Sequence, residues 1–216
     1  MRAVIFANGS LKPPVALNNN DFIIAADGGT RHCLALGLRP AVVIGDLDSL
    51  TQSDLQTLAS LGAEILQFPT RKDFTDLELA LSHASSLGMR EVLILGALGA
   101  RWDQTLANVA LPAAFPELNI RLEDGNQEVL YIHGGETVSI SGSPGDTLSL
   151  IPLGSEAKGI TTMMLEYPLT GEDLPLGSTR GVSNVLLADT VQISLHSGLL
   201  LCVLIHGQSD QIGTVN

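Results

Sequence analysis

The chain has 216 residues, of which 45 % are hydrophobic and 16 % are charged, a composition typical of a globular protein and not of a disordered one. Acidic residues outnumber basic residues by 23 to 11, giving a formal charge of −12. This balance argues against a nucleic-acid partner, because nucleic-acid binders normally present a basic face.

The N-terminal apolar run is too short for a signal peptide, and the longest late run, residues 199–205, is too short to span a membrane. We therefore expect a cytoplasmic protein without a membrane partner. The cysteines, Cys33 and Cys202, lie far apart in apolar surroundings and are expected to be buried, reduced thiols.

Short apolar runs alternate with helical patterns through residues 1–126. The runs are bounded by Gly, Asn, Asp or Pro and are typical of buried strands, which we expect at residues 4–7, 23–26, 41–44, 65–68 and 92–95. Capping residues and apolar stripes predict helices at residues 30–36, 51–61 and 75–87. This alternation predicts an α/β domain with a mostly parallel sheet flanked by helices.

Residues 127–216 show a different pattern, because no helical period of useful length appears there. Short β-type runs punctuated by Gly, Ser, Pro and Asp fall at residues 129–133, 137–140, 147–152, 160–165, 185–187, 191–195 and 199–205. These runs predict an all-β domain, an antiparallel sandwich or a partial jelly roll. His196-Ser197-Gly198 between the last two runs has the features of a hairpin turn.

Polar or glycine-bearing turns follow most of the strands expected in the first domain. They are Asn8-Gly9, Asp27-Gly28-Gly29, Gly45-Asp46 and the turn of Gly96 to Gly99. Parallel sheets bind ligands beyond the carboxyl ends of their strands, and glycine turns can direct backbone amides at phosphate. Each turn alone could equally be an ordinary tight connection, and none matches a P-loop or a dinucleotide fingerprint.

Asp46 and Asp48 stand two residues apart at the end of a strand. If the backbone is extended, their side chains share a face, and two such carboxylates are ligands suited to Mg²⁺. The alternative is a loop in which Asp46 and Ser49 only cap turns.

Asp73 and Asp76 stand at the entrance of the helix expected at residues 75–87. A capping box of Thr75 and Glu78, with an acidic first turn, accounts for Asp76 but leaves Asp73 and Arg71-Lys72 unexplained.

Arg101 and Asp103 would add a bidentate phosphate donor and a further carboxylate, while Trp102 between them is expected in the core. Lysines are scarce, so we expect the negative charge of a polyphosphate to be balanced by a metal ion together with Arg71, Lys72 and Arg101. The histidines show no zinc-ligand spacing, and no acyl-transfer motif is present.

In these segments the chain resembles the thiamine pyrophosphokinase family. The matching segments occur in the family's order: 27–29, 45–49, 72–81, 95–103, 106–108, 166–169 and 181–184. The resemblance implies Mg²⁺-dependent transfer of a pyrophosphoryl group from ATP to the hydroxyl of thiamine, with release of AMP. It also implies a nucleotide-binding catalytic domain at residues 1–126, a thiamine-binding β-sandwich at 127–216, and a homodimer with thiamine sites between the subunits.

The resemblance assigns roles to individual residues. Catalytic residues would be Asp46, Asp48, Asp73, Asp76, Arg101 and Asp103, with the metal held by Asp46, Asp73, Asp76 and Asp103. The nucleotide would be bound by Asp27, Gly28, Gly29, Lys72, Gly96 and Gly99, and thiamine by Ser183 and Asn184. Outside the matching segments, Asn8 and Gly9 at the same sheet edge and Arg71 beside Lys72 are expected to add to the nucleotide site. Gln104 stands where the family usually has histidine, and glutamine cannot accept a proton near neutral pH.

Three other interpretations stay open. A related diphosphokinase acting on a pterin alcohol would use the same α/β site, but the β half and residues 181–184 favour thiamine. A phosphohydrolase would place a nucleophilic aspartate directly after the first strand, where this chain has Asn8-Gly9. A non-catalytic protein that binds thiamine or a nucleotide is suggested by Gln104 alone.

Overall fold

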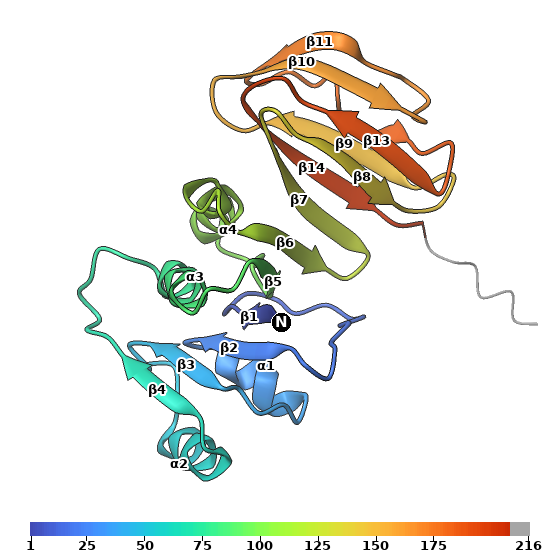
Figure 1. Cartoon of the computed structure of the whole chain (residues 1–216). Helices are drawn as coiled ribbons and strands as arrows, with labels where there is room; N and C mark the ends of the chain where they lie inside the picture. The colour runs from blue at the N-terminus through green and yellow to red at the C-terminus, as the bar shows by residue number, and fades with distance from the viewer. Residues whose placement is uncertain (208–216) are drawn as a thin grey trace, which may run out of the picture. The chain divides into compact units, whose positions relative to one another are not determined.

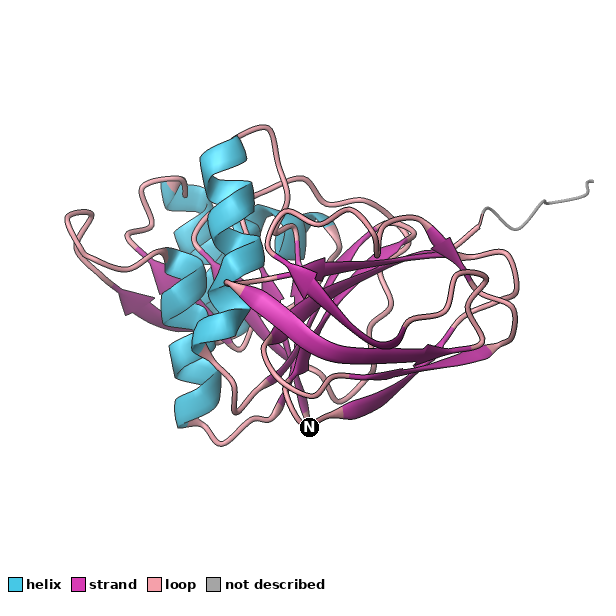
Figure 2. Cartoon of the chain, turned by 90° about the horizontal axis from the view of Figure 1, so that it is seen from above, coloured by secondary structure: helices cyan, strands magenta, loops and turns pink. Residues whose placement is uncertain are grey.

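The computed structural model describes residues 1–207 (Figure 1). The chain divides into two compact units, the first ending at Gly125 and the second beginning at Asn126. In the described part of the chain, every helix belongs to the first unit. Figure 2 shows these helices in cyan. None of these helices combines the length and the apolar character that crossing a membrane requires.

A parallel sheet forms the centre of the first unit, with strand order β6-β5-β1-β2-β3-β4. The strands are β1 (Arg2–Phe6), β2 (Phe22–Ala26), β3 (Val42–Gly45), β4 (Glu64–Gln67), β5 (Glu91–Leu95) and β6 (Asn119–Asp124). The order of the strands reverses at β1, because β2 to β4 continue on one side of it and β5 and β6 on the other. Open α/β sheets bind ligands at such a reversal.

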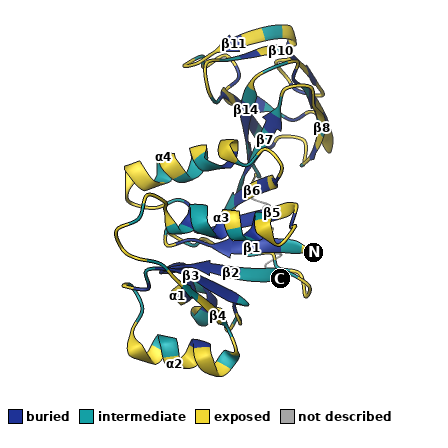
Figure 3. Cartoon of the chain, turned by 60° about the vertical axis from the view of Figure 1, so that its left-hand side comes forward, coloured by how far each residue is buried: buried dark blue, intermediate teal, exposed yellow. Residues whose placement is uncertain are grey.

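Helices cover both faces of this sheet (Figures 1 and 3). They are α1 (Gly29–Ala35), α2 (Gln52–Leu61), α3 (Asp76–Ser86) and α4 (Trp102–Ala110), followed by the short 3-10 helix η1 (Leu111–Ala114). Cys33 of α1 and Leu58 of α2 join one apolar cluster with Val4 and Phe6 of β1. The opposite helix α3 contacts β1, β2 and β3 and buries its apolar stripe, Leu77, Ala80, Leu81 and Ala84.

The helices begin and end where their capping residues predict. Thr51 and Asp54 form a reciprocal capping box at the start of α2, and Gly62 ends that helix with a φ of 74°. The Thr75 hydroxyl accepts a hydrogen bond from the Glu78 amide at the start of α3. The helices and strands expected before residue 96 are thus confirmed to within a few residues, but α4, η1 and β6 were not predicted.

The second unit is an antiparallel β-sandwich, which confirms the predicted fold class. Its sheets have the orders β12-β9-β14-β7 and β11-β10-β13-β8. The strands are β7 (Gln127–His133), β8 (Thr137–Ser141), β9 (Thr147–Pro152), β10 (Glu156–Met163), β11 (Thr170–Pro175), β12 (Asn184–Val185), β13 (Thr190–Ser194) and β14 (Leu199–Ile205). Inward residues such as Leu150, Ile160, Val191 and Cys202 form one continuous apolar cluster.

The hairpin predicted at His196-Ser197-Gly198 is wrong. The strands on either side of it, β13 and β14, lie in different sheets, so this segment crosses between the two layers of the sandwich. Ser197 pairs with Lys158 of β10, and a side chain on Gly198 would meet the Glu156 carbonyl oxygen at 2.3 Å. Gly198 therefore serves close backbone packing in a crossover and not a two-residue turn.

Both cysteines are buried free thiols, as predicted. Burial raises the pKa of Cys33 to about 12 and that of Cys202 to about 12. The charged thiolate is disfavoured in such surroundings, so neither thiol is suited to nucleophilic chemistry.

Candidate active site

A cleft of about 980 Å³ lies at the carboxyl edge of the parallel sheet. It is formed by the turns after β1, β2, β3 and β5 and by the first turns of α3 and α4. Among its lining residues are these predicted site residues: Asn8, Gly9, Asp27, Asp46, Asp48, Asp76, Gly99, Arg101 and Asp103. The strand ends thus bring together residues from five segments that are distant in sequence, in a volume suited to a small-molecule ligand.

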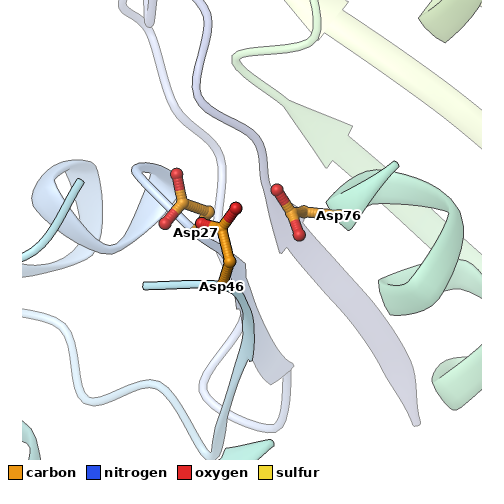
Figure 4. Close-up of side chains that lie close together, drawn as sticks. All are labelled: Asp27, Asp46 and Asp76. Atoms are coloured by element: carbon orange, nitrogen blue, oxygen red, sulfur yellow. The ribbon is translucent and has the colours of Figure 1, made fainter. Parts of the chain in front are cut away.

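Three carboxylates meet in this cleft (Figure 4). Asp27 follows β2, Asp46 follows β3 and Asp76 begins α3, and each offers one oxygen within 4.8 Å of the others. We call these residues the three-carboxylate group. Of the four predicted metal ligands, Asp46 and Asp76 belong to it, whereas Asp73 and Asp103 do not.

Asp27 is the most buried member of the group. It is 6 % exposed, and its Oδ1 atom has no hydrogen-bond partner among the described residues. A buried carboxylate oxygen without a donor is unfavourable unless a cation or a proton compensates it. The oxygen donor set and this unpartnered atom fit a hard divalent cation such as Mg²⁺.

Backbone geometry explains how these carboxylates approach each other. Gly45 has a φ of 152°, and a side chain there would meet the Asp27 Cβ at 2.9 Å and Asp76 Oδ1 at 3.1 Å. Asp27 itself has a φ of 43°, a left-handed conformation that aspartate tolerates better than most residues. The glycine before Asp46 is therefore required for the group to form.

Lys72 supplies an ammonium to the three-carboxylate group. Its Nζ lies 3.0 Å from Asp76 Oδ1 and 3.9 Å from Asp46 Oδ2, and its side chain is 12 % exposed. Burial raises the pKa of Asp76, with Asp27 and Asp46 adding to the shift and Lys72 opposing it. The raised pKa indicates that one lysine only partly compensates the group.

Asp48 does not share a face with Asp46, contrary to the sequence prediction. Leu47 between them has a φ of 63°, so the backbone is not extended. The Asp48 amide instead donates to Asp46 Oδ1 at 3.2 Å, the turn-capping geometry of the alternative interpretation. Asp48 is exposed in the cleft, and repulsion from Asp46 raises its pKa.

The turns after β1 and β5 are joined by backbone hydrogen bonds. Gly9 donates to the Gly96 oxygen at 2.8 Å, and Ser10 donates to the Leu98 oxygen at 2.7 Å. A side chain on Gly9 would meet the Leu98 oxygen at 2.3 Å. Close packing of the turns thus accounts for this glycine, and His32 adds a hydrogen bond from its Nε2 to the Gly9 oxygen at 2.8 Å.

The second glycine turn is also packed against its neighbours. A side chain on Gly28 would meet Asn8 Oδ1 at 2.1 Å, and one on Gly29 would meet the Phe6 oxygen at 1.9 Å. Neither glycine lines the cleft, nor does Gly96, whereas Gly9 and Gly99 do. The latter pair is therefore better placed to meet a ligand.

Arg101 and Asp103 form a two-bond ion pair at the start of α4. The Nη2–Oδ2 distance is 2.5 Å and the Nε–Oδ1 distance is 3.2 Å, and both residues are exposed. The bond from Arg101 lowers the pKa of Asp103 and raises that of Arg101. Trp102 is 78 % exposed, so the expectation that it packs in the core was wrong.

Arg71 and Asp73 are exposed in the loop before α3 and are not among the residues that line the cleft.

In the second unit, Asn184 is buried, and its side chain bonds to both backbone polar groups of Tyr167 and to the Val185 amide. Ser183 is exposed beside it, with its amide donating to Ser149 Oγ at 3.0 Å. Asn184 therefore has a structural role whatever else it does.

Helix α4 contributes cleft residues that the sequence prediction did not assign. Thr105 Oγ1 accepts from the Gly99 amide at 3.1 Å, and the Asn108 side chain donates to the Ala97 oxygen at 2.8 Å. These contacts fix the turn after β5. Asn108 belongs to segment 106–108, which matched the family without being given a role, and Thr105 lies three residues earlier on the same helix face.

Comparison with known proteins agrees with this geometry. A family model described as "Thiamin pyrophosphokinase, catalytic domain" matches residues 14–122, and one described as "Thiamin pyrophosphokinase, vitamin B1 binding domain" matches residues 135–200. The chain is 29 % identical over 182 residues to thiamine pyrophosphokinase of Bacillus subtilis, an alignment covering 83 % of this chain and 85 % of that protein.

Solved structures show the same similarity along almost the whole chain. The crystal structure of thiamine pyrophosphokinase from Bacillus subtilis has a TM-score of 0.87 at 27 % identity, covering 95 % of this chain and 99 % of that one. Thiamin pyrophosphokinase from Geobacillus thermodenitrificans has a TM-score of 0.83 at 26 % identity, covering 97 % and 99 %. From the fold, the cleft and both family models, the chain belongs to the thiamin pyrophosphokinase family.

Proposed function

We propose that the protein is a thiamine diphosphokinase, which transfers a pyrophosphoryl group from ATP to the hydroxyl of thiamine and releases AMP. Membership of the family supports this activity. The observation that carries the proposal is the three-carboxylate group inside a cleft of about 980 Å³. Such a group can hold a divalent cation, and polyphosphate transfer depends chiefly on positioning and charge neutralisation.

The first unit would bind ATP, so the nucleotide-binding catalytic domain would coincide with residues 1–126. Asp27, Asp46 and Asp76 would hold Mg²⁺, with Asp103 and Asp73 as the further ligands that the resemblance implies. Bound Mg²⁺ supplies charge neutralisation for the polyphosphate and for the leaving AMP. Gly9 and Gly99 line the cleft, and because they lack side chains they would let the polyphosphate approach the backbone closely, although their own amides already donate to Gly96 and Thr105.

Arg101 would transfer its hydrogen bonds from Asp103 to the polyphosphate. Both side chains are exposed, and exposed ion pairs contribute little to stability, so this exchange of partners requires little free energy. The guanidinium is suited to phosphate because its donors form a planar fork.

A carboxylate, and not Gln104, would orient the acceptor hydroxyl and accept its proton. Asp48 lines the cleft outside the three-carboxylate group, and repulsion from Asp46 raises its pKa. A raised pKa makes a carboxylate a better proton acceptor at neutral pH. Gln104 also lines the cleft, where its amide would donate or accept hydrogen bonds without taking a proton.

The second unit would bind thiamine near Ser183 and Asn184, in a cytoplasmic homodimer with the thiamine sites between subunits. Exposed apolar residues, found on each of the two units, support the dimer. Met164, Tyr167 and Leu187 are exposed apolar residues joined by backbone and side-chain hydrogen bonds to the segment around Asn184. Helix α4 has no buried residue and exposes Trp102 and Leu106, as Figure 3 shows for the helix.

Chromatography of products after incubation with ATP, Mg²⁺ and thiamine tests the proposal. We expect AMP and thiamine diphosphate in equal amounts, with no product when a pterin alcohol replaces thiamine. ADP with thiamine monophosphate would mean transfer of a single phosphoryl group, and the proposal would be wrong. Binding of thiamine without turnover would support a non-catalytic protein instead.

A further inference from the structure

Lys72 occupies a position that a metal ion would also favour. Its ammonium lies 3.0 Å from Asp76 and 3.9 Å from Asp46, two of the three carboxylates that can share a cation. The third, Asp27, is more than nine-tenths buried and has an oxygen without a hydrogen-bond partner among the described residues. The ammonium therefore offsets part of the negative charge, but Asp76 Oδ1, like Asp27 Oδ1, has no hydrogen-bond partner of good geometry among the described residues.

An ammonium and a divalent cation compete for carboxylate oxygens, because each is stabilised by the same negative charge and each repels the other. The divalent ion carries twice the charge and can contact all three carboxylates. Lys72 has a flexible stem of four methylenes and lies in the loop between β4 and α3, so its ammonium can move without moving a helix or strand.

We propose that Lys72 is an exchangeable counterion, which holds Asp46 and Asp76 together when no metal is bound and is displaced by the divalent cation toward the polyphosphate. The second half of this statement rests on the proposed function, since it requires ATP in the cleft. Lys72 is then a positioning residue for the metal ligands before binding and a charge donor to phosphate afterwards.

This exchange differs from a purely structural ion pair in one measurable respect. If Lys72 only supports the fold of the loop, neutralising it loosens the carboxylates and weakens metal binding. If its ammonium competes with the metal, neutralising it strengthens metal binding. The direction of the change therefore separates the two roles.

Mn²⁺ is a suitable probe because it shares the preference of Mg²⁺ for carboxylate oxygens and its free concentration can be measured by electron paramagnetic resonance. In the absence of nucleotide, we expect the full-length K72Q variant to bind Mn²⁺ about tenfold more tightly than the wild type. This is the size of effect expected when one nearby positive charge is removed from a cation site. The matched control is K12Q, because Lys12 pairs with Asp124, which does not belong to the three-carboxylate group. Equal or weaker binding by a folded K72Q, or no binding by either protein, would overturn the exchange.

A measurement on the wild type keeps the proposal testable if K72Q does not fold. The chain has three lysines, Lys12, Lys72 and Lys158, so ¹³C-lysine labelling gives a simple spectrum. Saturation with Mg²⁺, verified by calorimetry, should shift the Lys72 side-chain resonances and leave those of Lys12 and Lys158 in place. An unshifted Lys72 resonance under saturation would contradict displacement.

The proposed movement of Lys72 toward the polyphosphate is tested with α,β-methylene ATP, which cannot be cleaved between its α- and β-phosphorus atoms. In the presence of Mg²⁺, K72Q should bind this analogue about tenfold more weakly than the wild type, and K12Q should bind it equally well. Unchanged affinity of K72Q would overturn the movement of Lys72 to phosphate. Product analysis of the wild type tests the proposed function separately, so either idea can fail without the other.

Discussion

Each unit of the protein contains a cluster of carboxylates, and the two clusters are built differently. In the first unit, three carboxylates share one nearby lysine, and a buried oxygen of Asp27 has no hydrogen-bond partner among the described residues. In the second unit, the imidazole of His206 lies between Asp146 at 3.0 Å and Glu128 at 2.8 Å. The Asp146 carboxylate also accepts from the amides of Ser143 and Gly207.

The pKa values show the difference in compensation. Burial raises the pKa of Asp76, and Lys72 only partly opposes this shift. Burial also acts to raise the pKa of Asp146, but hydrogen bonds from Gly207, Ser143 and His206 outweigh it and the pKa is lowered. A carboxylate whose oxygens all accept hydrogen bonds stabilises the fold. A carboxylate whose negative charge is only partly balanced by its neighbours can bind a cation instead.

The largest effect should come from Asp27→Asn. Asparagine tolerates the left-handed backbone of this position, so the substitution removes the charge and keeps the local conformation. We expect thiamine diphosphate formation to fall by about a hundredfold or more, as for loss of other preorganised electrostatic groups. Unfolding by urea without divalent cations should show equal or higher stability, because an uncompensated buried charge is removed. Turnover within about threefold of the wild type would contradict this role of Asp27.

The opposite outcome is expected for Asp146→Ala in the second unit. Loss of a buried carboxylate that accepts several hydrogen bonds should lower the free energy of unfolding by about 2 kcal/mol and leave the affinity for Mn²⁺ unchanged. Asp189→Ala is the matched control, since Asp189 lies in the same unit and is exposed. Equal stability of the two variants would show that the Asp146 cluster is not structural.

The smallest effect is a pH dependence arising from His206. Its hydrogen bond to Glu128 is the main cause that raises its pKa above the ordinary 6.5, with Asp146 adding to the shift against burial. The stability contributed by a raised pKa is fully present below pH 6.5 and is lost as the pH rises through the folded-state value. The stability difference between the wild type and His206→Gln should therefore decrease from pH 6 to pH 9. Because the side chain is partly exposed, we expect a change below about 1 kcal/mol. A constant difference across this range would mean that the imidazole does not titrate within the cluster.

Much of the fold was predictable because its signals are local. The capping box of Thr51 and Asp54 marks the start of α2, and the apolar run 199–205 coincides with β14. Strand β11 was missed because its sequence, with Gly171, two acidic residues and Pro175, lacks the residues that favour strands. Such a sequence is tolerated there because β11 is an edge strand that pairs with β10 alone. Helix α4 was missed although Trp102, Leu106 and Val109 recur at helical spacing, because Arg101 and Asp103 were considered only as ligand contacts of the preceding turn.

The site was predictable in its location but not in its geometry. Strand ends place Asp27, Asp46 and the Gly96 turn at one edge of the sheet, and the sequence shows this. Which carboxylates meet depends on backbone angles that the sequence does not reveal, such as the left-handed φ of Leu47, a conformation rare for leucine. Asp48 therefore lines the cleft near Asp46 but is not a member of the three-carboxylate group. The strand order then puts Asp27 beside Asp46, although 18 residues separate them along the chain.

The central claim is that the cleft of the first unit transfers two phosphates as one group. ATP labelled with ³²P at the β-phosphorus tests it most directly, when incubated with the protein, Mg²⁺ and thiamine and followed by separation of the products. We predict that the label appears in thiamine diphosphate and that AMP is unlabelled. Label retained in ADP, with thiamine monophosphate as the other product, would contradict the account.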